Sequence, residues 1–251
     1  MNLHTSVTES FSAKLMEILD HVEYRRVESS EDMEEVARIR YKAYKMADIL
    51  PLSGTKLIDD VDFDPQAYVF GVYYDEQLIS TVRMHHVTPD HRVSSSREIF
   101  PAQIDEFLNA GMSLIDPVRF AADPAIMKEM PAIPYLTLRI AIMAAAYFDT
   151  DRVLQLVCPQ HAAFYKRVFY AQTIVPPTKS CGKYNIDLTL MATDTKDVGR
   201  KLLTRFPFFI SSPSERRLMF SRGEVSTLPP LTILPTARYM PAGDLGVDLP
   251  L

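Results

Sequence analysis

The chain has 251 residues, of which 47% are hydrophobic, enough to bury a sizeable core in one large domain or in a core with an extension. Its formal net charge is −5 at pH 7; residues 1–125 carry 12 Lys and Arg against 22 Asp and Glu, and residues 126–251 carry 15 against 10. The acidic half and the absence of RNA-binding or zinc-finger motifs exclude general nucleic-acid binding. The basic half fits either an acidic partner or ordinary surface charge.

The cysteines and the apolar runs argue against an oxidising or membrane environment. Cys158 and Cys181 lie in no CxxC motif, so we expect reduced thiols in a cytoplasm and neither a zinc site nor a disulfide framework. The N-terminus shows no signal-peptide pattern. The longest apolar stretch, residues 140–148, is too short to cross a bilayer, so we expect no integral membrane association.

The N-terminal elements are expected to be a helix, a strand and a second helix. Residues 8–21 read as a short amphipathic helix and residues 22–28 as a strand. Ser29, with an acidic residue three positions later, predicts the start of a helix whose apolar residues recur at helical spacing to about residue 47. We expect residues 48–64 to be irregular.

The middle of the chain alternates strands and helices. Residues 67–74 and 78–87 predict a hairpin, and residues 100–110 a short helix that ends at Gly111. We then expect a strand, an apolar helix, a buried strand, a helix with proline in its first turn, and a last strand. Their ranges are 113–122, 133–148, 152–157, 159–170 and 183–191.

The C-terminal part differs in composition. Residues 196–206 predict an amphipathic helix, and the prolines beyond Arg222 predict an extended tail unless it docks on the core or on a second subunit. We therefore divide the chain into an N-terminal helical segment (1–21), a main domain (22–193) and an extension (194–251). The element order predicts a mixed, twisted α/β sheet with helices on both faces. Its cleft should lie where strands 113–122 and 152–157 separate.

Five segments, in the same order, resemble acyl-homoserine-lactone (autoinducer) synthases and N-acyl amino acid synthases of the FeeM type. They are an Arg-x-x-x-aromatic segment, an acidic loop, a strand arginine, a Glu-x-x-Arg-Phe strand with Asp for Glu, and an Asn-Pro-x-His-x-x-Phe-Tyr segment with Cys for Asn. The matching residues are Arg40 with Tyr44, Asp60 with Asp62 and Asp64, Arg83, Asp116 with Arg119 and Phe120, and Cys158 with His161, Phe164 and Tyr165.

This resemblance implies the GNAT (acyl-CoA N-acyltransferase) fold and an acyltransferase of the bacterial cytoplasm. The implied reaction moves a fatty acyl group from a thioester to the amine of an amino acid, with no permanently bound cofactor. The chain has no tryptophan, whereas autoinducer synthases usually carry one after the first-helix aromatic. Synthesis of acyl-homoserine lactone from S-adenosylmethionine is therefore the alternative, and a non-catalytic acyl-binding module is the third hypothesis.

The glycine pattern bears on the acyl donor. Acetyl-CoA-binding relatives cradle the pyrophosphate with a glycine-rich loop before the central helix. Here no glycine lies between Gly111 and Gly182, and the loop 123–134 contains three prolines. We therefore expect acyl carrier protein, with acyl-CoA as the alternative. An acidic carrier would suit six basic residues: Arg139, Arg152, Lys166, Arg167, Lys179 and Lys183.

The resemblance also implies roles in the reaction. Asp116 is the candidate base or orients the base, and a salt bridge to Arg83 or Arg119 is its structural alternative. A backbone N–H near a bulge at residues 120–122, which include Phe120 and Ala121, would bind the oxyanion. Tyr165 would protonate the leaving thiolate or serve as a core or rim aromatic.

The acceptor would meet charged side chains. The three aspartates of the acidic loop would bind its ammonium group, pair with Arg40, or be solvated. Arg40, Arg83 and Arg119 would bind its carboxylate or neutralise the acidic cluster; Tyr44 would line the same site.

The remaining predictions concern the acyl slot and metals. Apolar side chains of the central helix and the next helix would line the slot or fill the core: Leu136, Ile140, Met143 and Phe164. His85 and His86 point to opposite faces of a strand, and His91 lacks a convincing partner, so we expect no metal site. The oligomeric state is not predicted.

Overall fold

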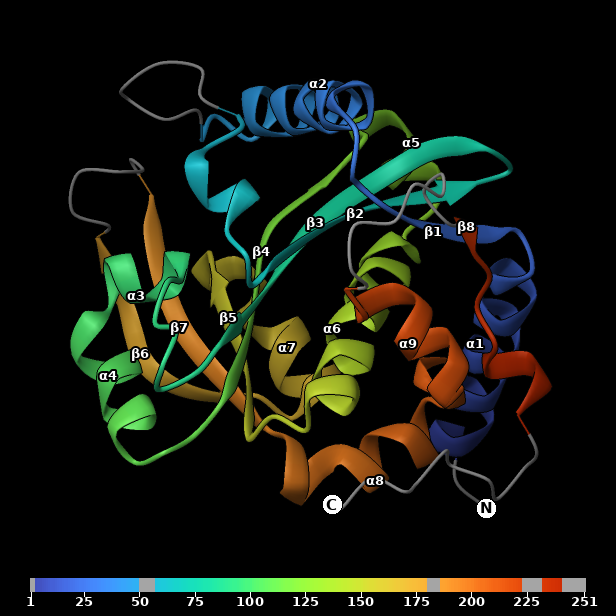
Figure 1. Ribbon diagram of the computed structural model, residues 1–251. Coiled ribbons are helices and arrows are strands. Elements are labelled where there is room, and N and C mark those ends of the chain that lie inside the picture. Colours follow the sequence, from blue (N-terminus) through green and yellow to red (C-terminus); the bar gives the residue numbers. More distant parts are fainter. Residues whose placement is uncertain (1–2, 50–56, 180–185, 223–231, 241–251) are drawn as a thin grey trace.

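The computed structural model describes residues 3–49, 57–179, 186–222 and 232–240. Its centre is a strongly twisted eight-stranded sheet in the order β6-β7-β5-β4-β3-β2-β1-β8 (Figure 1). Neighbouring strands are antiparallel, except that β4 and β5 are parallel. The strands are β1 (Val22–Arg26), β2 (Ala67–Tyr74), β3 (Gln77–Val87), β4 (Leu114–Ala122), β5 (Arg152–Val157), β6 (Gln172–Lys179), β7 (Asp187–Asp194) and β8 (Thr232–Ile233).

Helices cover both faces of this sheet. On one face, α2 packs against β3 and β4, while α6 packs against the opposite face of the same strands and α9 packs on α6 (Figure 1). The α-helices are α1 (Leu3–Leu19), α2 (Ser30–Met46), α3 (Ser95–Ile99), α4 (Pro101–Asn109), α5 (Pro124–Glu129), α6 (Ile133–Phe148), α7 (Ala162–Phe169), α8 (Thr195–Arg205) and α9 (Pro213–Phe220). Short 3-10 turns are η1 (Asp60–Phe63), η2 (Pro159–His161), η3 (Pro207–Phe209) and η4 (Ala237–Tyr239). None of the described helices has the length and apolar character needed to cross a membrane.

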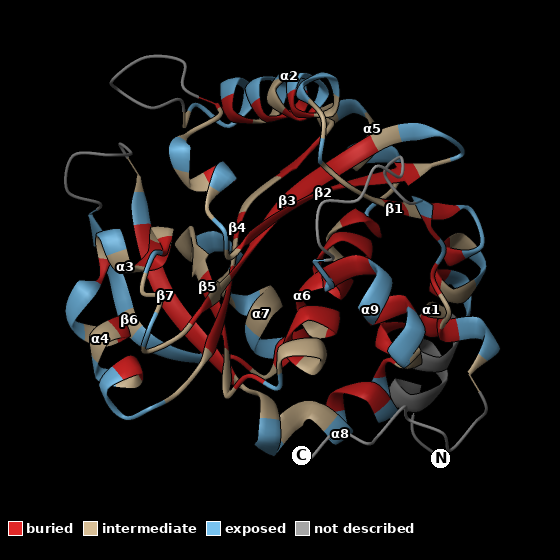
Figure 2. Ribbon diagram, in the orientation of Figure 1, coloured by how far each residue is buried: buried red, intermediate tan, exposed pale blue. Residues whose placement is uncertain are grey.

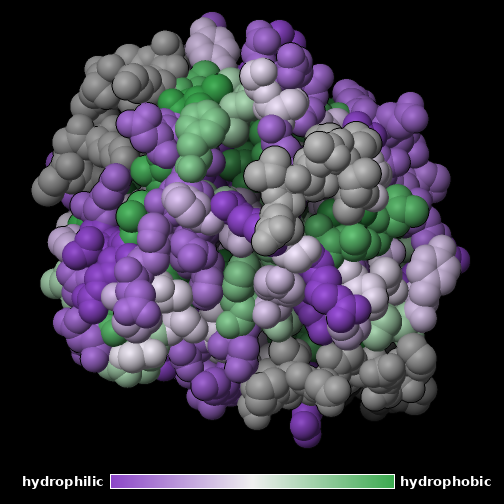
Figure 3. Space-filling model, viewed as in Figure 1, coloured by the Kyte–Doolittle hydropathy of each residue, from purple (hydrophilic) through white to green (hydrophobic). Residues whose placement is uncertain are grey.

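The central helix and its neighbours form as the sequence predicts. The helix α6 and the strand β5 have the predicted bounds, and Ser29 caps α2 by accepting a hydrogen bond from the Asp32 amide. Most residues of strands β2, β3 and β7 are buried, as are ten of the sixteen residues of helix α6 (Figure 2). Two clusters form most of the core: the larger lies around α6, and the smaller lies beneath α4. In the space-filling view the surface over α3 and α4 is mostly hydrophilic (Figure 3).

The segment after β7 is part of the core rather than a loosely attached tail. The helix α8 matches its prediction, but α9 and β8 were not predicted. The strand β8 extends the sheet by pairing with β1. The buried Arg139 of α6 bonds the backbone oxygens of Phe208 and Ile210, at 2.8 and 2.6 Å, and forms an ion pair with Glu215 of α9. Residues 223–231 and 241–251, most of the predicted proline-rich tail, lie outside the described residues.

The face of β3 toward α6 carries a histidine that predicts pH-dependent stability. His86 stacks on Phe148 with ring centroids 4.2 Å apart; burial, followed by the nearby His85 and His91, lowers its pKa from 6.5 to about 4. As pH falls below 6.5, the unfolded chain binds a proton that the folded protein does not. Stability present above pH 6.5 is therefore lost between pH 6.5 and 4.

We expect wild type to lose about 1 kcal/mol more unfolding free energy than a His86→Gln variant between pH 7 and pH 5, because only wild type carries this titration. The value is reduced from the full linkage because His86 is only partly buried. Urea unfolding of both proteins at the two pH values measures the difference. Equal losses would contradict the assignment.

Candidate active site

The strands β4 and β5 separate soon after they begin, as predicted. They pair only at Leu114 with Arg152 and at Ile115 with Val153. Further along β4 the ladder to β3 is interrupted, because Thr81 pairs with Ala121 whereas Arg83 pairs with Val118. The interval from residue 118 to residue 121 of β4 is therefore one residue longer than the interval from 81 to 83 of β3, which defines a β-bulge.

The bulge falls at Arg119 and Phe120, at the start of the predicted position. Arg119 has φ +58°, a left-handed conformation that is uncommon for a residue with a side chain. Such conformations persist when the surrounding structure holds them and are concentrated at functional sites. The bulge therefore lies on the part of β4 beyond its pairing with β5.

A buried ionic network lies on the α2 side of the sheet. Arg40 of α2 and Arg83 of β3 have no exposed surface. Arg40 makes a two-pronged contact with Asp62, at 2.9 and 3.0 Å, and also donates to the Leu57 carbonyl. Arg83 reaches Asp62 at 3.0 Å and Asp59 at 2.8 Å. The alternative in which an aspartate pairs with Arg40 is thus the one the structure shows for Asp62.

The same network extends to the bulge. Arg119 forms an ion pair with Asp59, so that two carboxylates join three guanidinium groups. Burial would raise the pKa of Asp59, but Arg83 and Arg119 outweigh it and lower the pKa to about 2. Asp59 is therefore ionised at neutral pH and is a poor proton acceptor. The network fixes the guanidinium group of Arg119 beside the bulge.

The three predicted aspartates of the acidic loop differ in their surroundings, and Asp60 shows the solvated alternative. Asp60 is exposed, whereas Asp59, which the sequence argument did not select, joins the arginines. Asp64 lies with two histidines instead, its Oδ1 being 3.0 Å from Nε2 of His85 and 2.8 Å from Nε2 of His91. The sequence does not reveal this grouping when the histidines are compared only with one another, because its third member is the aspartate of a distant loop. The absence of a metal stays a prediction.

Asp116 is not placed to take a proton from a substrate. Its side chain has no exposed surface, and the carboxylate accepts bonds from Ser94 Oγ at 2.7 Å, Ser96 N at 3.0 Å and Ser96 Oγ at 2.6 Å. These bonds anchor the start of α3, where Ser95 Oγ accepts from Arg83 at 2.7 Å. This burial and these bonds support the alternative in which Asp116 positions other groups, and its role in the reaction stays a prediction.

Because the Asp116 carboxylate only accepts bonds from Ser94 and Ser96, we expect a mild effect of Asp116→Asn. An amide can accept from Ser94 and the Ser96 amide, while the Ser96 hydroxyl rotates to accept from the new NH₂ group. We expect kcat to fall less than tenfold and the unfolding free energy to fall by about 1–2 kcal/mol. A roughly 10²- to 10⁴-fold loss of kcat, measured on a folded variant, would support the assignment of Asp116 as the general base.

Tyr165 and Cys158 follow the end of β5 in the chain. Tyr165 is half-buried on α7; burial, with a smaller effect of Cys158, raises the pKa of the phenol far above its ordinary value. Burial also raises the pKa of the Cys158 thiol. Tyr165 therefore keeps its proton at neutral pH. Its hydroxyl can donate a hydrogen bond to a sulfur anion, although complete proton transfer to it would be uphill.

The N-terminus of α6 does not offer a pyrophosphate cradle. The preceding segment folds as α5, and the amide of Ile133 bonds the Met130 carbonyl. Pro134 has no amide hydrogen, and the amide of Tyr135 bonds the Ala132 carbonyl. The N–H groups that usually bind phosphate at a helix start are thus already paired or absent.

Several predicted surface and pocket residues are in fact core. Arg139 is fully buried, so it cannot contact a carrier protein from the surface. Leu136, Ile140 and Met143 also have no exposed surface and pack in the larger core cluster, with Phe164 partly buried against it. This arrangement supports the core alternative for these residues.

The other predicted basic contacts are at the surface or undescribed. Lys166, Arg167 and Lys179 are exposed. Arg152 is half-buried and pairs with Asp194. Lys183 lies outside the described residues. Among the predicted acceptor contacts, Tyr44 is buried against Leu57 and Ala121.

Comparisons with known proteins agree with this architecture. The family model for N-acyl amino acid synthase FeeM matches residues 35–194. No curated protein sequence matches the chain. The structure of FeeM, an N-acyl amino acid synthase from uncultured soil microbes, superposes with a TM-score of 0.59 at 16% identity, over 72% of this chain and 95% of that one.

Two further solved structures are similar. An acyl-CoA N-acyltransferase from Pseudomonas aeruginosa has 12% identity and a TM-score of 0.49, over 68% of this chain and 99% of that one. The CoA-dependent acyl-homoserine lactone synthase BjaI has 10% identity and a TM-score of 0.49, over 74% and 89%. The family match covers well over half of the sequence. The chain has the GNAT fold and is an N-acyltransferase that belongs to the N-acyl amino acid synthase family FeeM.

Proposed function

We propose that this enzyme transfers a fatty acyl group from acyl carrier protein to the amine of an amino acid. The observation that carries the proposal is the ionic network that ends at Arg119, beside the bulge of β4. It places a cationic group next to the backbone that would bind the thioester carbonyl. Membership of the FeeM family supports the same reaction class.

The network suits an acceptor that carries a carboxylate. Arg40, Arg83 and Arg119 bring three guanidinium groups to Asp59 and Asp62, and Arg119 stands at the end of this network beside the bulge. Arg40 and Arg83 are fully buried, which leaves Arg119 as the member nearest the opening. A bidentate contact from arginine would fix the acceptor carboxylate and direct its amine toward the thioester. Asp60, exposed on the same turn, is not required.

The reaction itself needs few groups from the protein. The neutral amine attacks the thioester carbonyl, a C–N bond forms and the C–S bond breaks. Backbone N–H groups at Phe120 and Ala121 would stabilise the oxyanion, and Tyr165 would donate a hydrogen bond to the departing sulfur. One proton leaves the amine and one is taken up by the thiolate, so the protons balance through solvent.

The helix start supports the carrier protein as donor. A phosphopantetheine arm carries one phosphate, whereas coenzyme A carries a pyrophosphate; in α6 the amides of Ile133 and Tyr135 are paired and Pro134 has none. Lys166 and Arg167 on α7 and Lys179 on β6 are exposed and would meet an acidic carrier.

The test uses purified enzyme with dodecanoyl carrier protein or dodecanoyl-CoA and a panel of amino acids, with mass spectrometry of the products. We expect N-dodecanoyl amino acid, formed faster from the carrier protein. Equal or faster use of dodecanoyl-CoA would contradict the proposed donor. Release of methylthioadenosine with S-adenosylmethionine would favour the autoinducer alternative, and no product from any pair would contradict the proposed function.

A further inference from the structure

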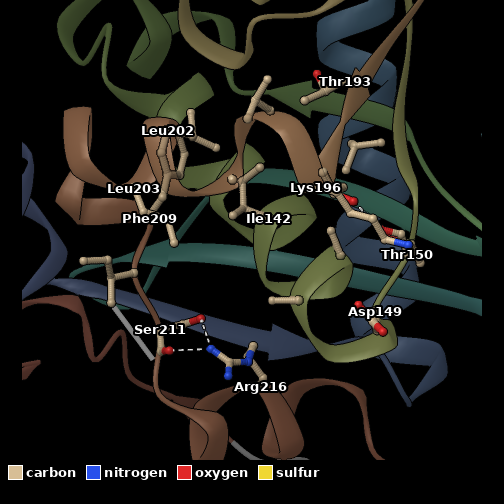
Figure 4. A pocket seen from close by; sticks show the side chains of 17 residues that line it. Ile142, Asp149, Thr150, Thr193, Lys196, Leu202, Leu203, Phe209, Ser211 and Arg216 are labelled. Carbon is tan, nitrogen blue, oxygen red and sulfur yellow. Dashed lines mark hydrogen bonds between the residues drawn. The ribbon is translucent and has the colours of Figure 1, made fainter. Parts of the chain in front are cut away.

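An apolar pocket lies between the C-terminal half of α6 and α8 (Figure 4), and no residue of β4 lines it. It has a volume of about 60 Å³. On this measure a single water needs roughly 10–15 Å³. The pocket therefore has room for several linked carbon atoms.

The walls of the pocket come from segments far apart in the sequence. Ile142 of α6, Leu202 and Leu203 of α8 and Phe209 of η3 line the pocket (Figure 4), as does Ala145 of α6. Aliphatic and aromatic walls of this kind favour a hydrocarbon chain over a polar ligand.

One buried cation borders these apolar walls. Arg216 of α9 is 9% exposed and donates from Nη1 to the backbone oxygen of Ser211 at 2.5 Å and to its Oγ at 3.2 Å (Figure 4). The adjacent Glu215 is engaged by Arg139, at 2.5 and 3.1 Å, and by Thr236.

Within the described part of the chain, Arg216 forms no salt bridge. Burial lowers its pKa. The charge of the neighbouring Glu215 offsets part of this effect, but Glu215 is itself paired with Arg139, so a further anion would stabilise the buried guanidinium group. The guanidinium group is also suited to bind a carboxylate through two parallel hydrogen bonds.

We propose that this pocket binds an apolar chain that ends in a carboxylate, with the carboxylate on Arg216 and the chain between α6 and α8. A free fatty acid and an N-acyl amino acid share this chemistry. The site is separate from the β4–β5 opening, and the proposal does not depend on the identity of the acyl donor or acceptor.

The test is isothermal titration of the full-length protein with octanoate, octan-1-ol and N-octanoylglycine. We expect saturable binding of octanoate and about tenfold weaker binding of the alcohol, which lacks the charge. Arg216→Gln should weaken octanoate binding about tenfold and leave octan-1-ol unchanged. Arg217→Gln, an exposed neighbour on the same helix, is the matched control and should bind as wild type does.

A second variant locates the chain. Ala146→Leu narrows the pocket from α6 without changing its charge, so it should weaken both octanoate and the alcohol. Circular dichroism confirms that each variant is folded. Tighter binding of N-octanoylglycine than of octanoate would identify an acylated amino acid as the fitting ligand, and the reverse a free fatty acid. No saturable binding of either carboxylate, or equal octanoate binding by wild type and Arg216→Gln, would overturn the proposal.

Discussion

An Asp62→Asn variant is expected to lose about 3–5 kcal/mol of unfolding free energy, because the change removes one partner of buried ion pairs. Asp62 holds two arginines, Arg40 at 2.9 Å and Arg83 at 3.0 Å, and the side chains of all three are fully buried. Without the carboxylate both guanidinium groups remain away from water with less negative charge beside them. The same change would loosen the support of Arg119 through Asp59, so activity should fall as well.

Urea unfolding of wild type, Asp62→Asn and Asp60→Asn measures this effect. Asp60 is exposed two positions earlier in the same turn, and its replacement makes the same chemical change. We expect Asp60→Asn to remain within about 0.5 kcal/mol of wild type, as exposed substitutions usually do. Equal stability of the two variants would show that the buried network contributes little.

A Glu215→Gln variant should show a second large loss, also about 3–5 kcal/mol, for the same physical reason. The Glu215 carboxylate accepts hydrogen bonds from Nη1 and Nη2 of Arg139 and from the amide of Thr236. These bonds join α9 to α6 and to the segment after β8. An amide would place its NH₂ group against one of these donors. The C-terminal segment should therefore detach more readily from the sheet.

Thermal unfolding and limited proteolysis of Glu215→Gln, with Glu106→Gln on the exposed side of α4 as control, test this expectation. We expect a lower midpoint and faster cleavage after α8 in the first variant only. A wild-type midpoint for Glu215→Gln would mean that apolar packing alone holds α9 in place.

The sequence predicts elements well where one local pattern dominates. The apolar residues of α6 and of β5 begin and end where these elements do, so the predicted bounds match the structure. The strand β6 was missed because it contains Pro176 and Pro177, which cannot donate ladder hydrogen bonds and are tolerated at a sheet edge. The two-residue strand β8 depends wholly on pairing with β1, a contact that no local pattern reveals.

The site was predicted in part for related reasons. Family resemblance located Arg40, Arg83 and the bulge on β4, but it could not show which aspartate of a run would turn inward. Asp59 and Asp62 both meet the arginines, because η1 begins after Asp59 and turns Asp62 into the core while Asp60 lies in solvent. Arg139 appeared to be a surface cation because its partner, Glu215, is 76 residues away on an unpredicted helix.

The most direct test of the account compares an amino acid with its carboxamide as acceptor. Purified enzyme would be given dodecanoyl carrier protein with the best acceptor from the panel, or with the same compound lacking only the negative charge of its carboxylate. If the arginine network positions the acceptor, kcat/KM should fall at least about 100-fold for the carboxamide, in keeping with a charge-assisted bidentate contact. Equal kcat/KM for the two acceptors would contradict the assignment of Arg119 and its network to acceptor binding.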